Sequence, residues 1–332
     1  MTALSHPRKD QSGAALIVVL LLVATLAFIL LSISEQVKAS VERSAADRAR
    51  AELMWRAAAG REVVRRMLEK VFQENPPSAM IANAGLFAQE FDLPYQYGAA
   101  SVRFRDATRC FNLNALTIAD SGGGGGSGAS VSEMDRLARL ATALGLGDSE
   151  AQKFASVVGD FIDKDSTENI GGAEDGFYTA LPIPFRTAGG PIASVTELRA
   201  MDGVTRGLYR RLKPSLCAID AAEHPTVNVN MLNAHDAPLI YAMTNGGWDL
   251  SAIRSQIENR PPGGWSAVND FWAPYTSDGG APPANSGSLT TSRIEAIIRL
   301  EVNGRTMEEK LLFSIDNSGK PELVAHTFGD DY

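Results

Sequence analysis

An uninterrupted apolar run near the amino terminus constrains this chain more than any other feature. Residues 14–33, AALIVVLLLVATLAFILLSI, contain no charged side chain. As a helix that rises about 1.5 Å per residue, the run is about 30 Å long, which matches the hydrocarbon core of a bilayer. We therefore expect one transmembrane helix over these residues.

The sequence before the run indicates how this helix is oriented. Residues 1–13, MTALSHPRKDQSG, are polar and place Arg8 and Lys9 close to the membrane edge. Because basic residues accumulate on the cytoplasmic side, the first residues are expected in the cytoplasm. A cleaved secretory signal is one alternative, but its apolar core would be about 7–15 residues long and would end in a small-x-small site. A plain membrane anchor explains the run but not its flanks.

The sequence after the run is predicted to continue the helix. Residues 34–72 are rich in Ala, Glu, Arg and Met, which favour helices, and no proline follows before Pro76. One helix is expected from Ala14 to about Phe72, within an amino-terminal helical region that we assign to residues 14–75. Half of this helix would lie in the membrane and half outside it.

This amino terminus resembles that of type IV pilins and pseudopilins. In that family a polar cytoplasmic leader ends in glycine, and a prepilin peptidase cuts after this glycine, so that the apolar helix stays on the mature protein. The resemblance implies that residues 1–13 are the leader. It also implies that Gly13 precedes the cut and that Ala14 is the first mature residue.

The fifth mature position departs from the common pilin pattern. Most pilin-like subunits carry a glutamate there, which neutralises the amino-terminal charge of a neighbouring subunit in a place where a bare charge is costly. Counted from Ala14, this position is Val18. A subunit without the glutamate resembles the K component of the general secretion pathway, a minor pseudopilin placed at the filament tip. Taken alone, Val18 also fits a membrane protein that is no pilin.

The middle of the chain is predicted to be mainly helical. Apolar residues recur at steps of three and four after Ser132 and again after Ser149, two candidate N-caps. Further short helices, broken by glycine, are expected in residues 195–203, 205–219, 233–247 and 250–260. The glycine-rich stretch 121–130 is expected to be a flexible loop that serves only as a linker.

Strands are predicted on both sides of this helical block. Residues 101–116 alternate apolar and polar side chains, which indicates one or two half-buried strands. The dipeptide Asn303-Gly304 strongly favours a tight hairpin. Three antiparallel strands are therefore expected at the carboxyl end, over residues 294–302, 307–315 and 322–328.

The predicted fold is α+β, with a long N-terminal transmembrane helix and a pilin-like antiparallel sheet domain interrupted by a large inserted α-helical domain. We assign residues 76–112 and 289–332 to the pilin-like domain and residues 113–288 to the insertion, which is tolerated where chain ends lie close together. The resemblance to K pseudopilins implies the same organisation. It is carried, in order, by residues 110–116, 160–178, 184–219 and 226–234.

Residues 195–212 resemble a helix-hairpin-helix unit, a module often used on DNA. The arginines that could contact phosphates are Arg199, Arg206, Arg210 and Arg211. Neighbouring carboxylates and a net charge of −8 oppose this, so we expect a role in protein packing and no nucleic-acid partner. The sequence contains no GxSxG, P-loop or HExxH motif, and we expect no enzymatic activity.

An acidic segment is the candidate metal site. Six carboxylates fall within residues 160–175, and they repel one another unless they are solvated or neutralised. The Asp-x-Asp alternation and the following glycines suit Ca²⁺, although EF-hand spacing is absent, and a solvated acidic loop is the alternative. The resemblance to K pseudopilins implies calcium binding in the helical domain. The expected ligands are Asp163, Asp165, Glu168, Glu174 and Asp175, with Asp160 as a secondary candidate.

The chain has two cysteines, Cys110 and Cys217. Outside the cytoplasm they could form a disulfide that closes a long loop, since disulfides persist there. Two buried free thiols are the alternative. Two cysteines are too few for a disulfide framework or a four-thiolate zinc site.

The resemblance implies a minor pseudopilin of the type II secretion system, which caps or primes the tip of the periplasmic pseudopilus for export of folded proteins across the outer membrane. Expected partners are the I-type and J-type minor pseudopilins, the prepilin peptidase and the inner membrane. The chain would cross that membrane once, with its amino terminus cytoplasmic and its bulk periplasmic. The alternatives are a minor pilin of a type IV pilus and a membrane-tethered DNA-uptake protein.

We predict that Gly13→Val blocks processing, because the peptidase must fit a small residue at its membrane-level active site. The variant should keep the mass of residues 1–13, and secretion should stop. Mass spectrometry of the wild-type protein and the variant checks this prediction. A wild-type mature start far from Ala14 would contradict it.

Overall fold

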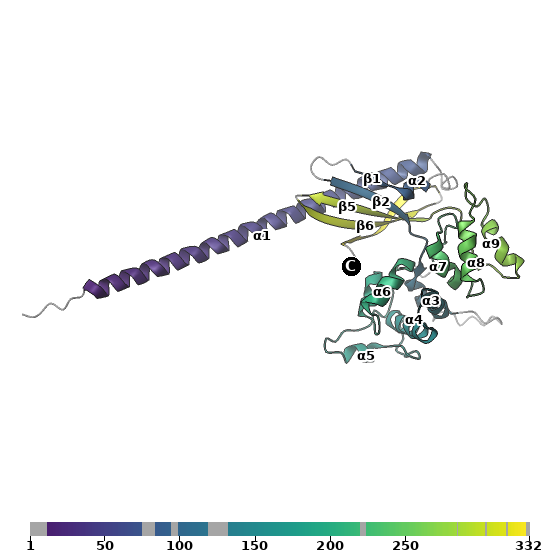
Figure 1. Ribbon diagram of the computed structural model, residues 1–332, viewed down its shortest axis with the longest axis horizontal. Helices are drawn as coiled ribbons and strands as arrows, with labels where there is room; N and C mark the ends of the chain where they lie inside the picture. Colours follow the sequence, from purple (N-terminus) through teal and green to yellow (C-terminus); the bar gives the residue numbers. More distant parts are fainter. Residues whose placement is uncertain are drawn as a thin grey trace, which may run out of the picture.

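The computed structural model describes residues 12–74, 84–93, 99–118, 132–219, 224–283, 285–302, 304–316 and 318–329. A long helix projects from a head made of a sheet domain and a helical domain (Figure 1). Most of the expected leader and the glycine-rich stretch 121–130 lie outside the described residues.

Helix α1 (Ser12–Glu74) is continuous from the apolar run to the head. Its most apolar 18-residue window has a mean hydropathy of 3.2 and is not buried at all, so the helix is long and apolar enough to span a membrane. The carboxyl-terminal part of α1 packs on the sheet instead. Its buried side chains are those of Leu53, Ala57, Val64, Leu68 and Phe72.

The sheet has five antiparallel strands in the order β1-β2-β5-β6-β7. Their bounds are β1 (Glu90–Asp92), β2 (Ala99–Asp106), β5 (Arg293–Val302), β6 (Arg305–Ile315) and β7 (Pro321–Phe328). The short helix α2 (Ala84–Ala88) precedes β1. Alternate side chains such as Val102, Phe104, Ile298 and Phe313 are buried against α1, so one sheet face and one helix form the first hydrophobic core.

The helical domain lies between β2 and β5 in sequence, which confirms the predicted fold class. Its α-helices are α3 (Glu133–Ala143), α4 (Asp148–Ile162), α5 (Asp175–Thr179), α6 (Arg206–Leu212), α7 (Ala237–Met243), α8 (Leu250–Glu258) and α9 (Val268–Ser277). Its 3-10 helices are η2 (Leu113–Ile118), η3 (Val195–Ala200), η4 (Lys213–Ser215) and η5 (Ala234–Asp236). Two short parallel strands, β3 (Phe111–Asn112) and β4 (Leu216–Cys217), complete it.

The structure also differs from the sequence-based prediction in detail. Ser132 is the N-cap of α3, as expected, but α4 begins one residue before Ser149, with Gly147 as its N-cap. Helix α9 was not predicted because Pro274 lies inside it. The three carboxyl-terminal strands are confirmed; Gly304 at the β5–β6 turn has a φ of 72°, and Asn303 lies outside the described residues.

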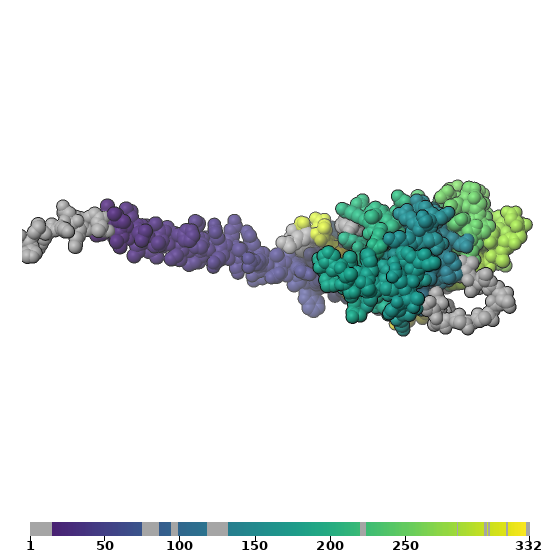
Figure 2. Space-filling model, turned by 90° about the horizontal axis from the view of Figure 1, so that it is seen from below, coloured from purple at the N-terminus to yellow at the C-terminus, as the bar shows by residue number. Residues whose placement is uncertain are grey.

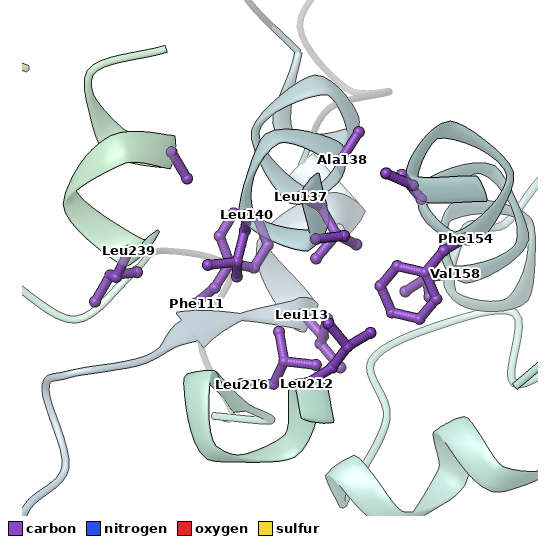
Figure 3. Close-up of a cluster of buried hydrophobic side chains, with 14 of the residues drawn as sticks. Phe111, Leu113, Leu137, Ala138, Leu140, Phe154, Val158, Leu212, Leu216 and Leu239 are labelled. Atoms are coloured by element: carbon purple, nitrogen blue, oxygen red, sulfur yellow. The ribbon is translucent and has the colours of Figure 1, made fainter. Parts of the chain in front are cut away.

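Helix α3 lies at the centre of the second hydrophobic core. Figure 3 shows Leu137 and Leu140 of α3 among side chains from α4, β3 and α7, including Phe154, Phe111 and Leu239. All of these side chains are nearly or fully buried. This core is separate from the one under α1, so the chain folds as two packed units on one helical stalk.

The helical domain uses one structural scheme twice. In the first half, the side-chain amide of Asn114 binds both backbone groups of Ile192. Its oxygen accepts a hydrogen bond from the Ile192 N–H at 2.8 Å, and its nitrogen donates one to the Ile192 carbonyl at 3.0 Å. In the second half, Asn230 binds Trp265 in the same way, at 2.6 and 3.2 Å. Each half therefore fixes a distant loop through one buried asparagine.

Three further features repeat between the halves. A parallel pairing joins Asn112 to Cys217 and Asn228 to Ser288. Asn114 and Asn230 each donate their backbone N–H to the asparagine two residues earlier. Helices α3 and α7, the first α-helices of the two halves, pack against each other. The helical domain is thus a pair of related units.

A buried polar network lies where the chain leaves the sheet domain for the helical domain and where it returns. The Asp106 carboxylate accepts hydrogen bonds from the Thr108 backbone N–H at 2.8 Å and from the hydroxyls of Thr108 and Thr291. Asn228 donates to the two threonine hydroxyls, at 3.1 and 2.9 Å. Burial raises the pKa of Asp106, against the effect of these hydrogen bonds. The network ties the end of β2 to the start of β5.

Cys110 and Cys217 form a disulfide, with a Cα–Cα distance of 5.7 Å and 107 residues between them in sequence. The bond joins the segment after β2 to β4 and so closes the first half of the helical domain.

Replacing both cysteines with serine should lower the free energy of unfolding by about 4–5 kcal/mol, because a loop of this length gains much entropy in the unfolded chain. Urea unfolding of the oxidised wild-type protein and of the double-serine variant measures the difference. Reduction of the wild-type protein should reproduce it, and equal stabilities would contradict this account of the disulfide.

Candidate metal centre

Three carboxylates converge at the end of α4 and the start of α5. Asp160, Asp163 and Glu174 each offer an oxygen, and these oxygens lie within 4.8 Å of one another. All three residues are buried, with Asp160 fully inaccessible. Carboxylates buried at this separation repel one another more strongly than at the surface, because water screens them less, and a bound cation would offset this repulsion.

Helix α4 positions the first of these carboxylates. Asp160 lies in the last turn of α4. The two residues that follow it in this helix, Phe161 and Ile162, belong to the hydrophobic core. Its carboxylate accepts hydrogen bonds from Asn169, at 3.2 Å from the backbone N–H and 2.6 Å from the side-chain amide. The following loop therefore folds back over the end of the helix.

Two glycines allow this loop to approach Asp160. The Gly172 N–H donates to the Asn169 carbonyl at 2.8 Å, which closes a tight turn, and Gly171 has a φ of 78°. A Cβ atom at Gly172 would lie 1.8 Å from Oδ2 of Asp160. Only glycine fits at this position, because the loop backbone lies directly against the carboxylate.

Glu174 completes the cluster from the start of α5. Its Oε2 accepts a hydrogen bond from the Asp175 N–H at 3.3 Å, whereas Oε1 is buried and has no hydrogen-bond partner among the described residues. Burial raises the pKa of Glu174, and the charges of Asp160 and Asp165 raise it further. An unsatisfied carboxylate oxygen pointing into an acidic cluster is typical of a cation ligand.

The donor set fits a hard cation. Carboxylate oxygens from two segments suit Ca²⁺, which takes six to eight oxygens in adaptable geometry and can complete its shell with carbonyls and water. The absence of nitrogen and sulfur donors among Asp160, Asp163 and Glu174 disfavours zinc.

The predicted ligands fall into three groups. Asp163 and Glu174 lie in the cluster, together with Asp160, which the sequence ranked second. Asp165 and Glu168 are exposed, although Asp165 is close enough to affect the pKa of Glu174. The three-residue spacing from Asp160 to Asp163, across the end of a helix, is the signal that could have ranked Asp160 higher.

Asp175 has partners of its own. It accepts hydrogen bonds from Thr187, at 2.8 Å from the backbone N–H and 3.0 Å from the hydroxyl, and pairs with Arg186 at 2.8 Å. The hydrogen bonds from Thr187 lower the pKa of Asp175 most, and Arg186 lowers it further. Asp175 thus anchors the loop that returns toward α4.

The helix-hairpin-helix-like segment is packed into the protein. Its first part is the 3-10 helix η3 and its second is α6, joined through Gly203 with a φ of 71°. Leu198 and Leu212 are buried in the helical core. Asp202 pairs with Lys153 of α4 at 2.9 Å.

Comparisons with known proteins agree with this architecture. Two family models, both described as type II secretion system (T2SS), protein K, match residues 109–221 and 227–292. These ranges correspond to the two halves of the helical domain.

Type II secretion system protein K of Pectobacterium carotovorum subsp. carotovorum is 30% identical over 291 residues, covering 87% of this chain and 86% of that protein. The protein K of Aeromonas hydrophila is 30% identical over 262 residues, covering 77% and 78%. Among solved structures, a chain of the GspK-GspI-GspJ complex from enterotoxigenic Escherichia coli matches with a TM-score of 0.68 at 23% identity, over 86% of this chain and all of that chain.

Proposed function

The chain belongs to the type II secretion system protein K family and is a minor pseudopilin of type II secretion; on this premise we propose that it occupies the tip of the pseudopilus, where it caps or primes the filament. The observation that carries the proposal is the shape of the head. The helical domain makes the head much wider than the stalk, as Figure 2 shows, and it would obstruct a subunit stacked above.

Val18 supports the same position. A filament in which one contact repeats requires both surfaces of that contact on every subunit. With Val18 in place of a glutamate, the chain has no carboxylate at this position to neutralise the amino terminus of a subunit above. The chain would then bind the filament through one contact surface only and would terminate it.

The proposed partners are the I-type and J-type minor pseudopilins. Support comes from the structural relative, which was solved as a GspK-GspI-GspJ complex. The apolar part of α1 is unburied in the single chain and is available for neighbours in the membrane and in the assembly.

The proposed location is the inner membrane, crossed once by α1, with the head in the periplasm. Arg8 and Lys9 before the apolar run support a cytoplasmic amino terminus, and Gly13 is the proposed site of prepilin peptidase processing. The Cys110–Cys217 disulfide fits an oxidising compartment. The proposed role is one of assembly rather than catalysis, in keeping with the family.

Calcium is the proposed cofactor. Asp160, Asp163 and Glu174 would hold the ion, and the charge of Asp165, which raises the pKa of Glu174, acts on the same cluster. The ion would neutralise the cluster and fix the loop between α4 and α5 on the helical core.

We predict that millimolar calcium raises the melting temperature of the wild-type protein and that chelator reverses this, because the ion binds only the folded cluster. Asp163→Asn should remove most of the calcium dependence. Glu150→Gln, which changes an exposed carboxylate on α4, is the matched control and should keep it. If neither calcium nor chelator changes the melting temperature of the wild-type protein, the segment is a solvated acidic loop and not a calcium site.

We also predict that the overexpressed chain forms no homopolymer and that Val18→Glu does not rescue polymerisation, since the head still obstructs stacking. Immunogold electron microscopy of pseudopili should label one end of each filament. Label spread along whole filaments would contradict the tip position, and homopolymers of the Val18→Glu variant would contradict the steric argument.

A further inference from the structure

The turn between η3 and α6, residues 201–205, lies at the middle of the helix-hairpin-helix-like segment. Gly203 gives this turn a φ of 71°. Residues 202–205 are exposed or half-buried, whereas Leu198 before the turn and Tyr209 after it are buried in the helical core. The position of the turn therefore depends on side chains that reach it from other segments.

Tyr178 of α5 connects the acidic cluster to this turn. The side chain of Tyr178 is fully buried, and its hydroxyl oxygen accepts a hydrogen bond from the Asp202 backbone N–H at 3.2 Å. Glu174, which belongs to the cluster, lies four residues earlier, and its carbonyl accepts a hydrogen bond from the Tyr178 N–H at 3.4 Å. One turn of helix thus separates a carboxylate of the cluster from the hydroxyl that binds the 201–205 turn.

Aromatic contacts hold the ring of Tyr178 in place. It packs edge-on against Phe161, with 5.5 Å between the ring centroids, and lies 5.0 Å from the ring of Phe185. Phe161 directly follows Asp160, a second member of the cluster, in the last turn of α4. Burial raises the pKa of Tyr178, and the charges of Asp202 and Asp160 raise it further, so the hydroxyl is within electrostatic reach of the cluster.

Lys153 of α4 forms a second connection. Its Nζ lies 2.9 Å from the carboxylate of Asp202, and a Cβ atom added to Gly203 would lie 3.9 Å from the same nitrogen. A Cβ atom added to Gly171 would lie 3.7 Å from Cγ of Lys153. The lysine side chain therefore lies between the loop that covers the acidic cluster and the 201–205 turn.

We propose that Tyr178 and Lys153 couple occupancy of the acidic cluster to the position of the 201–205 turn. Without a cation, Glu174 and Asp160 repel each other, and the buried Oε1 of Glu174 has no hydrogen-bond partner among the described residues. With a cation bound, the start of α5 is fixed against the end of α4, and the Tyr178 hydroxyl stays on the Asp202 N–H. The inference rests on the proposed calcium site and extends it, because the site then controls a surface turn outside its own loop.

Hydrogen exchange of the full-length wild-type protein in detergent micelles, with calcium and with chelator, tests this coupling. At a calcium concentration about ten times the dissociation constant, amides that exchange only after the ion has left should exchange about tenfold more slowly. Residues 163–175 and residues 202–205 should both show this slowing. Residues 244–248, which form the turn between α7 and α8, are the internal control and should not respond to calcium.

The substitution Tyr178→Phe separates the connection from the site. It keeps the aromatic ring and removes the hydroxyl that binds the Asp202 N–H. The variant should bind calcium with wild-type affinity in isothermal titration calorimetry and keep the slowing of residues 163–175, but it should lose most of the calcium effect on residues 202–205. Tyr241→Phe, which removes a tyrosine hydroxyl from α7, is the matched control and should behave as the wild-type protein does.

The substitution Lys153→Met tests the second connection. It keeps the aliphatic stem beside Gly171 and removes the ion pair with Asp202. Because Lys153 is half exposed, this ion pair contributes little, and the calcium effect on residues 202–205 should decrease less than in Tyr178→Phe.

The outcomes distinguish this inference from the calcium proposal. If calorimetry detects no calcium binding by the wild-type protein, the calcium site and the coupling both fail. If calcium binds and slows exchange of residues 163–175 but not of residues 202–205, the coupling alone is overturned. Equal calcium effects on residues 202–205 in the wild-type protein and Tyr178→Phe would overturn the role of the hydroxyl, as would loss of calcium binding in that variant.

Discussion

The packing of α1 against one face of the sheet is the interaction on which the rest of this structure depends. The sheet has no other described helix of comparable length on that face, and the side chains of Val64, Leu68 and Phe72 are almost inaccessible there. Each large apolar side chain buried in this way contributes about 1.5–3 kcal/mol. Because α1 is continuous into its apolar part, the same contact fixes the head to the apolar segment of this helix.

A buried ion pair sets the position of α1 on the sheet. Glu309 of β6 is fully inaccessible and lies 2.7 Å from Arg61 of α1 and 3.3 Å from His326 of β7. Burial raises the pKa of Glu309, and Arg61 and His326 oppose that shift. A displaced helix would leave this carboxylate buried without Arg61, which is costly, so the pair selects one arrangement more than it adds stability.

The apolar run, the α+β order and the carboxyl-terminal hairpin could be predicted from the sequence because each depends on local pattern. A 20-residue apolar run has few alternatives, and Asn303-Gly304 between alternating strands is a strong turn signal. Helix α9 escaped prediction because Pro274 is tolerated where Phe271 and Trp272 are buried in the core. Tertiary packing outweighs local propensity there.

The carboxylate cluster of Asp160, Asp163 and Glu174 was only partly predictable for a related reason. The acidic composition of residues 160–175 indicated a cation, but the sequence analysis ranked Asp160 below the other five carboxylates. Their ranking depends on burial, which places Asp160 inside and Glu168 outside, and on the partners that Asp175 finds in residues 186–187. Those contacts join segments that the sequence pattern does not relate.

The two halves of the helical domain explain why the cluster lies where it does. The halves differ in the length of one connection. In the second half, residues 259–264 connect the end of α8 to Trp265. In the first half, the corresponding connection from α4 to Ile192 takes residues 163–191. The acidic cluster therefore belongs to a segment that the repeated scheme does not contain.

That segment has little regular structure to hold it. It includes the five-residue helix α5, and Ile170 and Ile183 are strongly exposed on it. Its attachment to the core relies on Tyr178 and on the polar contacts around Asp160 and Asp175. A cation that joins the end of α4 to the start of α5 would supply the fixed point that an asparagine and a short loop supply in the second half. The acidic cluster thus lies in a long excursion from an otherwise repeated fold, at the point where that excursion leaves α4 and enters α5.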